Sequence, residues 1–177
     1  RNHSSAASDV YKRQAIGCLP KFSEVIYEFK KRDKNKPLIL MGSEHKQLID
    51  YVHESAIEDF ENIASKYWPG ALTMVIPSSE KETEILTSTD NTLGLRIPNS
   101  YMAQSLMLLT GPLLTSSANI SGFNGATTSE GIALDFPSLS ILGPVPWEKS
   151  SGKASTIIAW QKNRDWRLIR EGEVFVK

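Results

Sequence analysis

Cysteine is nearly missing from this sequence, since a single one, Cys18, stands among 177 residues. A lone cysteine excludes a disulfide framework and a cysteine-ligated zinc site, and it is typical of a reducing compartment. Net charge is missing as well, because 20 lysines and arginines balance 20 aspartates and glutamates, so a uniformly basic nucleic-acid-binding surface is excluded. No run approaches the ~18 apolar residues of a membrane span, and we therefore expect a cytoplasmic protein that does not enter a membrane.

The rest of the composition is that of an ordinary globular protein, with 40% hydrophobic and 23% charged residues. The length suits a single domain. Residues 1–14 differ from the remainder of the chain, because they are polar and show neither the period of a strand nor that of a helix. We interpret residues 1–14 as a tail or an artefact, and we expect the folded domain over residues 15–177.

Hydrophobic patterning from residue 15 onward predicts alternating helices and strands, and then a group of strands. Phe22, Val25, Ile26 and Phe29 recur at helical spacing, and the short apolar run 38–41 suits a buried strand. Further helices are predicted at 48–52, 57–67, 102–109 and 129–136, and further strands at 72–76, 93–97, 139–142, 156–158, 168–169 and 174–176. This order predicts an α/β or α+β fold with a mixed sheet.

Residues 30–36 (KKRDKNK) form a basic segment, with five basic residues and one acidic residue and thus a local charge of +4. Such a segment suits a polyanion, because lysine and arginine neutralise phosphate charge. The anion could be a nucleoside triphosphate or an RNA backbone. The alternative is a solvated helix end, where basic side chains complement the helix dipole.

Two further stretches place polar groups where they could meet a ligand. Arg96 lies within the predicted strand 93–97, so its side chain points to the face opposite its two neighbours. On a concave face it would clamp a carboxylate, and otherwise it is an exposed arginine. Residues 115–122 (TSSANISG) suit close approach of hydroxyl and backbone N–H groups to phosphates, or they form only a turn.

Other kinds of site are not indicated by the sequence. Residues 151–158 lack the glycine spacing of a phosphate-binding loop. His45 and His53 are too far apart for a metal pair on one helix, and no pair of acidic residues suggests acid–base catalysis. We expect no metal site built from protein side chains, and an enzyme that works by positioning and charge stabilisation.

Four motifs together resemble the YrdC-like family, the threonylcarbamoyl-AMP synthases (L-threonylcarbamoyladenylate synthases), in order and spacing. They are KxR…KPL at 30–38, WPGxLT at 68–73, GxRIP at 94–98 and TSSANISG at 115–122, with further similarity at 155–157 and 167–172. The resemblance implies a short, single-domain member. It also implies a YrdC-like α/β (α+β) fold, a twisted mixed sheet with flanking helices around a basic concave pocket.

The resemblance also implies a nucleotidyltransferase reaction. L-Threonine, bicarbonate or CO₂, and ATP would condense to threonylcarbamoyl-AMP and pyrophosphate, with Mg²⁺ accompanying the ATP. The product would pass to a tRNA threonylcarbamoyl transferase complex for modification of tRNA, and the protein itself could contact tRNA.

The family motifs carry roles onto particular residues. ATP contacts are implied for Lys30, Arg32, Thr115, Ser117, Asn119 and Arg170. Threonine contacts are implied for Arg96 at its carboxylate and for Ser155. No side chain is assigned as a nucleophile, and Lys30 and Arg32 are expected to act as charge stabilisers.

One part of the family pattern does not match. The family's opening strand, P-T-[DE]-T-x-Y-G-L, should end just before residue 15, and residues 8–14 do not resemble it. The roles of that strand's threonine and tyrosine in the substrate pocket cannot be assigned to residues of this chain. We therefore expect the chain as given to bind ATP weakly and to make little product. The rival interpretation is an RNA-binding module that uses the same basic pocket without catalysis, and a third is a structural or assembly protein.

Overall fold

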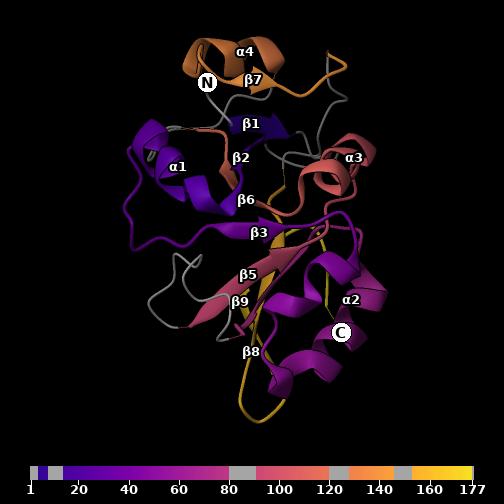
Figure 1. Ribbon diagram of the computed structural model, residues 1–177. Coiled ribbons are helices and arrows are strands. Elements are labelled where there is room, and N and C mark those ends of the chain that lie inside the picture. The colour runs from indigo at the N-terminus through magenta and orange to yellow at the C-terminus, as the bar shows by residue number, and fades with distance from the viewer. Residues whose placement is uncertain (1–3, 8–13, 80–90, 120–127, 146–152, 177) are drawn as a thin grey trace.

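A computed structural model describes the protein at residues 4–7, 14–79, 91–119, 128–145 and 153–176. Nine strands in these residues form one sheet in the order β7-β1-β2-β6-β3-β5-β4-β8-β9 (Figure 1). The strands are β1 (Ser4–Ala7), β2 (Ala15–Cys18), β3 (Ile39–Met41), β4 (Leu72–Pro77), β5 (Thr92–Arg96), β6 (Leu113–Ser117), β7 (Ser140–Ile141), β8 (Thr156–Trp160) and β9 (Trp166–Arg170). The pairs β1–β7, β3–β5 and β4–β8 are parallel and the others antiparallel, which confirms the predicted mixed sheet.

Within the described residues, four α-helices and several short 3₁₀ turns surround the sheet. The α-helices are α1 (Ser23–Lys30), α2 (Ile57–Tyr67), α3 (Tyr101–Thr110) and α4 (Ser129–Asp135), and the 3₁₀ turns are η1 (Pro20–Phe22), η2 (His45–Gln47), η3 (Ile49–Tyr51) and η4 (Glu54–Ala56). The Ser100 hydroxyl accepts from the Ala103 N–H and caps α3. Helix α1 is followed by Lys31, whose left-handed backbone (φ 49°) stops the helix.

The main hydrophobic core lies between one face of the sheet and helices α1 and α2. Alternate strand residues such as Ile16, Leu40, Leu95 and Met74 point into it, because successive side chains of a strand face opposite sides. A smaller cluster on the other face joins Met41 and Leu113 to Ala103 and Met107 of α3. The two faces of the sheet are therefore covered differently, and the second carries most of the predicted site residues.

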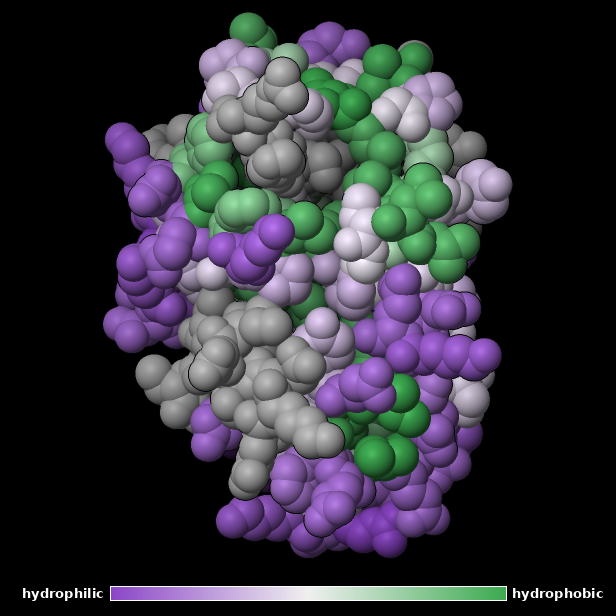
Figure 2. Space-filling model, viewed as in Figure 1, coloured by the Kyte–Doolittle hydropathy of each residue, from purple (hydrophilic) through white to green (hydrophobic). Residues whose placement is uncertain are grey.

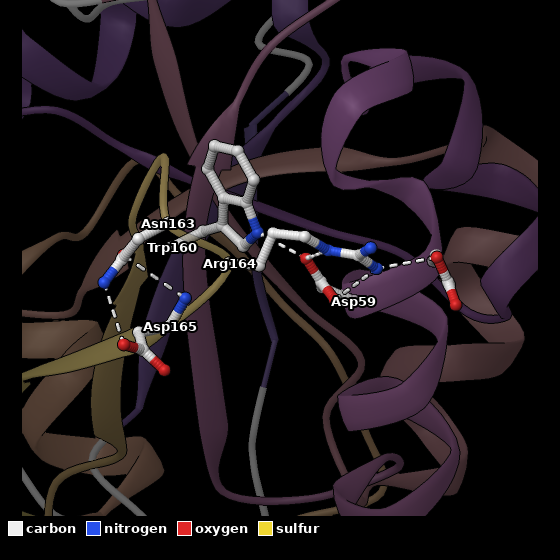
Figure 3. A network of polar contacts seen from close by, with 6 residues as sticks. Asp59, Trp160, Asn163, Arg164 and Asp165 are labelled. Atoms are coloured by element: carbon white, nitrogen blue, oxygen red, sulfur yellow. Dashed lines mark hydrogen bonds and ion pairs between the residues drawn. The ribbon is translucent and has the colours of Figure 1, made fainter.

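The hairpin of β8 and β9 is joined to α2 by a polar network (Figure 3). Arg164, in the turn between the two strands, lies 2.6 Å from Glu58 and 3.0 Å from Asp59 through Nη2. The indole N–H of Trp160 donates to the other Asp59 oxygen at 2.8 Å. Hydrogen bonds from Arg164, and then from Trp160, lower the pKa of the Asp59 carboxyl below its ordinary value.

Most of the predicted elements are confirmed within a residue or two, with two corrections. Residues 48–52 form 3₁₀ turns instead of an α-helix, and Val52 bridges to Ser78. Residues 174–176 do not form a strand. The Thr156 hydroxyl bonds both backbone groups of Val174, accepting from its N–H at 3.1 Å and donating to its carbonyl, so this backbone is satisfied without a strand partner.

Residues Ser4–Ala7 form β1, although the sequence predicted no regular element before residue 15. β1 pairs antiparallel with β2, from Ser4 opposite Cys18 to Ala7 opposite Ala15. Backbone pairing needs no hydrophobic period, so patterning could not detect this strand. The predicted domain boundary between residues 14 and 15 stays a prediction.

The surface is unevenly apolar. Figure 2 shows apolar side chains gathered over α3 and α4, where Leu108, Leu109 and Leu134 are exposed, and a largely hydrophilic surface around α2. No helix in the described part of the chain combines the length and the apolar character needed to cross a membrane.

Candidate functional site

The pairing register brings most of the predicted site residues onto one face of the sheet. Thr115 lies opposite Ile39, and Ile39 lies opposite Gly94, two residues before Arg96. Residues opposite each other share a face, as do residues two apart along a strand, so Thr115, Ser117 and Arg96 lie on the same side. The same rule, followed through β4 and β8, adds Thr73, Ser155 and Arg170.

Among the predicted site residues, Lys30 is the most buried charged residue, with 1% of its surface exposed. It ends α1, and its Nζ donates to the Ser117 carbonyl and lies 3.4 Å from Asn119 Oδ1 and 3.5 Å from Ser117 Oγ. Burial, and then the charge of Arg32, lower the pKa of Lys30 to about 8. Lys30, Ser117 and Asn119, which we call the Lys30 group, form a buried cation surrounded by hydroxyl and amide groups.

The other basic side chains of residues 30–36 are more exposed. Arg32 is half-buried, with Nε donating to the Lys36 carbonyl at 3.2 Å and Nη2 to the Pro37 carbonyl at 3.0 Å. Burial lowers its pKa from the ordinary value. Lys34 pairs with Glu24 at 2.5 Å in solvent. The segment therefore contributes one buried cation and a half-buried arginine beside it, which a count of charges could not distinguish.

Three residues of the 115–122 motif have hydrogen-bond partners of two kinds. Thr115 is 2% exposed, and its hydroxyl donates to the Ile39 carbonyl of the neighbouring strand at 2.9 Å. Ser117 and Asn119 are hydrogen-bonded to each other beside Lys30. Residues 120–122 of the motif lie outside the described residues. Within the described part, the end of β6 supplies the hydroxyl and amide groups of the Lys30 group.

Arg96 ends β5 and is 5% exposed. Its Nε donates to the Gly70 carbonyl at 2.9 Å, and the Gly70 N–H donates to the Ile97 carbonyl at 2.9 Å. A side chain at Gly70 would place its Cβ 2.3 Å from the Tyr67 carbonyl oxygen, so only glycine fits there. The sequence identified the WPG motif but did not predict that the Gly70 carbonyl of this motif holds the Arg96 side chain.

Ser155 and Arg170 are brought together by the structure. Arg170 donates to the Ser155 carbonyl from Nε at 3.1 Å and from Nη2 at 2.8 Å, and Nη2 also lies 3.1 Å from the Ser155 hydroxyl. The Thr73 hydroxyl donates to the Ser155 hydroxyl at 3.1 Å. Thr73 was not predicted as a site residue, although it stands in the WPGxLT motif. Thr73, Ser155 and Arg170 together make up the Ser155 group.

The Lys30 group and Arg96 are separated along and across the sheet. Arg96 is level with Leu113 of β6, because both lie opposite Met41, and Ser117 is four residues beyond Leu113. With two strand spacings across the sheet, Ser117 and Arg96 are roughly 16 Å apart. Arg96 is adjacent in register to Thr73 and thus to the Ser155 group. The face that carries Arg96 and the Ser155 group therefore has two arginines with hydroxyl groups at one place, and Ser117, which is the partner of the buried Lys30 of α1, at another.

Metal ligands and the single thiol are the remaining reactive groups. The described residues contain no group of three or more His, Cys, Asp or Glu side chains that could hold a metal ion. Cys18 is 1% exposed, and burial raises the pKa of its thiol to about 11. A thiol of this kind is a core residue and a poor nucleophile.

An open mixed sheet with cations and hydroxyl groups on one face defines an α/β protein suited to anionic ligands. The family model that matches the chain is that of the Sua5, YciO and YrdC proteins, described as telomere recombination, and it covers residues 14–172. Threonylcarbamoyl-AMP synthases of Yersinia pestis (strain Pestoides F) and Yersinia pseudotuberculosis serotype O:1b (strain IP 31758) are each 32% identical over 133 residues, 72% of this chain and 70% of theirs. The chain belongs to the Sua5/YciO/YrdC family, as the four motifs predicted.

Solved structures agree with this family. The crystal structure of P. abyssi Sua5 complexed with L-threonine superposes with a TM-score of 0.84 and 29% identity over 96% of this chain. The chain spans 50% of that Sua5 chain. E. coli YciO, at 21% identity and a TM-score of 0.74 over 96% of this chain and 83% of its own, shares the fold. The predicted fold class is thus confirmed.

Proposed function

We propose that this chain is a threonylcarbamoyl-AMP synthase, which condenses L-threonine, bicarbonate and ATP to threonylcarbamoyl-AMP and pyrophosphate. The observation that carries the proposal is that Ser117, Arg96 and the Ser155 group share one sheet face, while α1 brings the buried Lys30 to Ser117 at the end of β6. The curated relatives named threonylcarbamoyl-AMP synthase support the reaction, and the complex of P. abyssi Sua5 with L-threonine supports threonine as a substrate.

The reaction needs positioning more than it needs a side-chain nucleophile. The threonine amine bonds to the bicarbonate carbon and water leaves, which gives a carbamate. A carbamate oxygen then bonds to the α-phosphorus of ATP, while the bond from that phosphorus to the bridging oxygen of pyrophosphate breaks. Phosphoryl chemistry of this kind depends on in-line geometry and on cations that neutralise the triphosphate.

The residues divide between the two substrates. Lys30 and Arg32 would neutralise the triphosphate, and Thr115, Ser117, Asn119 and Arg170 would complete the nucleotide contacts. Arg96 would hold the threonine carboxylate through two parallel hydrogen bonds, with Ser155 beside it. Thr73 orients the Ser155 hydroxyl, because it donates a hydrogen bond to it.

Magnesium would enter with the nucleotide. Near the Lys30 group the described residues offer hydroxyl and amide oxygens, which suits an ion held mainly by phosphate oxygens and water. When bound, Mg²⁺ would neutralise charge on the leaving pyrophosphate. The product would pass to a tRNA threonylcarbamoyl transferase complex in the cytoplasm. Direct contact with tRNA is a further part of the proposal, whereas no comparison supports an RNA-binding module without catalysis.

The test is pyrophosphate release from ATP by the purified chain, with threonine and bicarbonate each omitted in turn. Release that requires both substrates supports the proposal, and release with neither, or none under any condition, contradicts it. Lys30→Ala with Arg32→Ala should weaken ATP roughly a hundredfold and threonine little, because each charge-assisted contact is worth about 1.5–3 kcal/mol. Lys34→Ala is the matched control, since Lys34 is exposed in the same segment and pairs with Glu24.

A further inference from the structure

The Ser155 hydroxyl lies between two neighbours that fix the direction of its own hydrogen bond. Its oxygen is 3.1 Å from the Thr73 hydroxyl and 3.1 Å from Nη2 of Arg170. A guanidinium group can only donate, so Arg170 takes one of the two acceptor positions of this oxygen. The direction of the bond to Thr73 then decides whether Ser155 has a proton left for a ligand.

Burial makes Thr73 the donor in this pair. Thr73 is 1% exposed, and within the described part of the protein its hydroxyl has Ser155 as its one partner. If Ser155 donated to Thr73, the Thr73 proton would be buried without an acceptor, which costs free energy. When Thr73 donates, both acceptor positions of the Ser155 oxygen are filled, and the Ser155 proton remains for a ligand.

Both side chains are held in this arrangement by their surroundings. The Thr73 methyl group lies on the β5 side, 3.7 Å from the position that a Cβ at Gly94 would occupy, and its hydroxyl meets Ser155 just before β8. A β-branched side chain with both arms placed in this way has little rotational freedom. The Ser155 carbonyl accepts from Nε and Nη2 of Arg170, and the pairing of β8 with β4 begins at Thr156. Ser155 is therefore fixed from two sides.

The charges nearby determine which end of an amino acid suits the Ser155 proton. Arg96 is adjacent in register to Thr73, and Arg170 contacts Ser155. Two guanidinium groups favour a carboxylate at this place and disfavour an ammonium group, which is positively charged and can only donate. Arg170 is exposed, so the Ser155 group borders on solvent and a small ligand can approach it.

We propose that Thr73 is a positioning residue, which together with Arg170 makes Ser155 a fixed hydrogen-bond donor to the carboxylate of the amino-acid substrate. This inference rests on the proposed function and adds the orientation of threonine to it. The threonine carboxylate meets Ser155 as well as Arg96, and the amine is directed away from the two arginines. Thr73 does not touch the substrate, and its effect passes through Ser155.

The test is calorimetric titration of the full chain with L-threonine. Thr73→Val keeps the shape of the side chain and removes the hydroxyl, so threonine affinity should fall about fivefold, as expected for the loss of one neutral hydrogen bond. Thr73→Ser keeps the hydroxyl and should stay within about twofold of wild type. Thr110→Val, at the exposed end of α3, is the matched control and should leave threonine affinity unchanged.

A double replacement separates positioning from a general structural effect. In the Ser155→Ala background, Thr73→Val should weaken threonine binding no further, because the residue through which Thr73 acts has lost its hydroxyl. Equal losses in the two backgrounds would overturn the proposal. Wild-type affinity in Thr73→Val, or a loss in Thr73→Ser as large as that in Thr73→Val, would also overturn it. Thermal unfolding of each variant checks that it is folded.

L-2-Aminobutyrate tests which group of the substrate Ser155 contacts, because it keeps the carboxylate and lacks the hydroxyl of threonine. Its affinity, measured through competition with threonine, should fall in Thr73→Val by the same factor. A loss confined to threonine would mean that Ser155 contacts the substrate hydroxyl, which contradicts the assignment of the carboxylate. A wild-type chain that binds no threonine contradicts the proposed function and this inference with it, whereas threonine binding that is insensitive to Thr73→Val contradicts this inference alone.

Discussion

Lys30 is a cation enclosed by protein, and its proton is the most sensitive property of the proposed ATP site. Its pKa of about 8 lies below the ordinary 10.5, with burial as the main cause. Between these two values the unfolded chain holds a proton that the folded chain has lost. The free energy of unfolding should therefore rise with pH over this interval, by at most about 1.4 kcal/mol per unit.

ATP affinity should change in the opposite direction. As pH rises through about 8, Lys30 loses the charge that would neutralise a phosphate, so ATP should bind more weakly at pH 9.5 than at pH 7.5. Calorimetric titration at several pH values measures the affinity, and chemical denaturation measures the stability. In Lys30→Met both trends should flatten, because that side chain has similar length and no proton to lose. Equal pH profiles for the two proteins would show that Lys30 does not titrate in this range.

Arg96 combines a charge with a planar shape, and the two can be separated by mutation. Arg96→Lys keeps the charge but loses the forked geometry, so threonine affinity should fall about tenfold or more while ATP affinity stays nearly unchanged. The replacement also loses the hydrogen bond to the Gly70 carbonyl, so some loss of thermal stability is expected. Threonine titration by calorimetry measures the effect, and wild-type threonine affinity in Arg96→Lys would remove Arg96 from the carboxylate site.

At the scale of elements, the β8–β9 hairpin depends on α2 through Asp59. Asp59 accepts hydrogen bonds from both Arg164 and Trp160. Among the contacts described, Glu58 accepts a hydrogen bond from the exposed Arg164 side chain alone. Asp59→Asn should lower stability by about 1 kcal/mol, or about 2–4 °C in melting temperature, and Glu58→Gln should lower it less. Differential scanning calorimetry of the two variants checks the order.

The pH dependence of this contact has a definite sign. The pKa of Asp59 is lowered in the folded protein, so its contribution is present above the ordinary aspartate pKa of about 4 and is lost as pH falls through the folded value. The difference in stability between wild type and Asp59→Asn should therefore shrink in acid. A constant difference down to pH 2 would mean that the carboxylate charge does not matter to the contact.

At the scale of the whole molecule, the proposed function assigns ATP and threonine to different parts of the sheet and Mg²⁺ to the nucleotide. Chelation of Mg²⁺ by excess EDTA should abolish pyrophosphate release and leave threonine binding within about twofold of its original value, since no described carboxylate cluster would hold the ion. Coupled pyrophosphate assays and calorimetry, run on the same sample, check both parts. Loss of threonine binding on chelation would place the metal at the threonine site instead.

The sequence was sufficient for the fold class, and its motifs singled out Lys30, Arg96 and Ser155 as candidate site residues. It could not show which partners they have. The Thr73–Ser155 hydrogen bond joins residues 82 positions apart and depends on the parallel pairing of β4 and β8.

The order of strands in the sheet has a consequence for synthesis on the ribosome. β2 and α1 emerge early, but their neighbour β6 comes much later, and the Lys30–Ser117 contact spans 87 residues. At about 5–20 residues per second, Ser117, whose carbonyl accepts the hydrogen bond from Lys30, is synthesised roughly 4–17 s after the lysine itself. During that time the ammonium group remains hydrated and α1 lacks its contacts with β6. The nascent chain must therefore keep its first strands from pairing with other chains until β6 arrives.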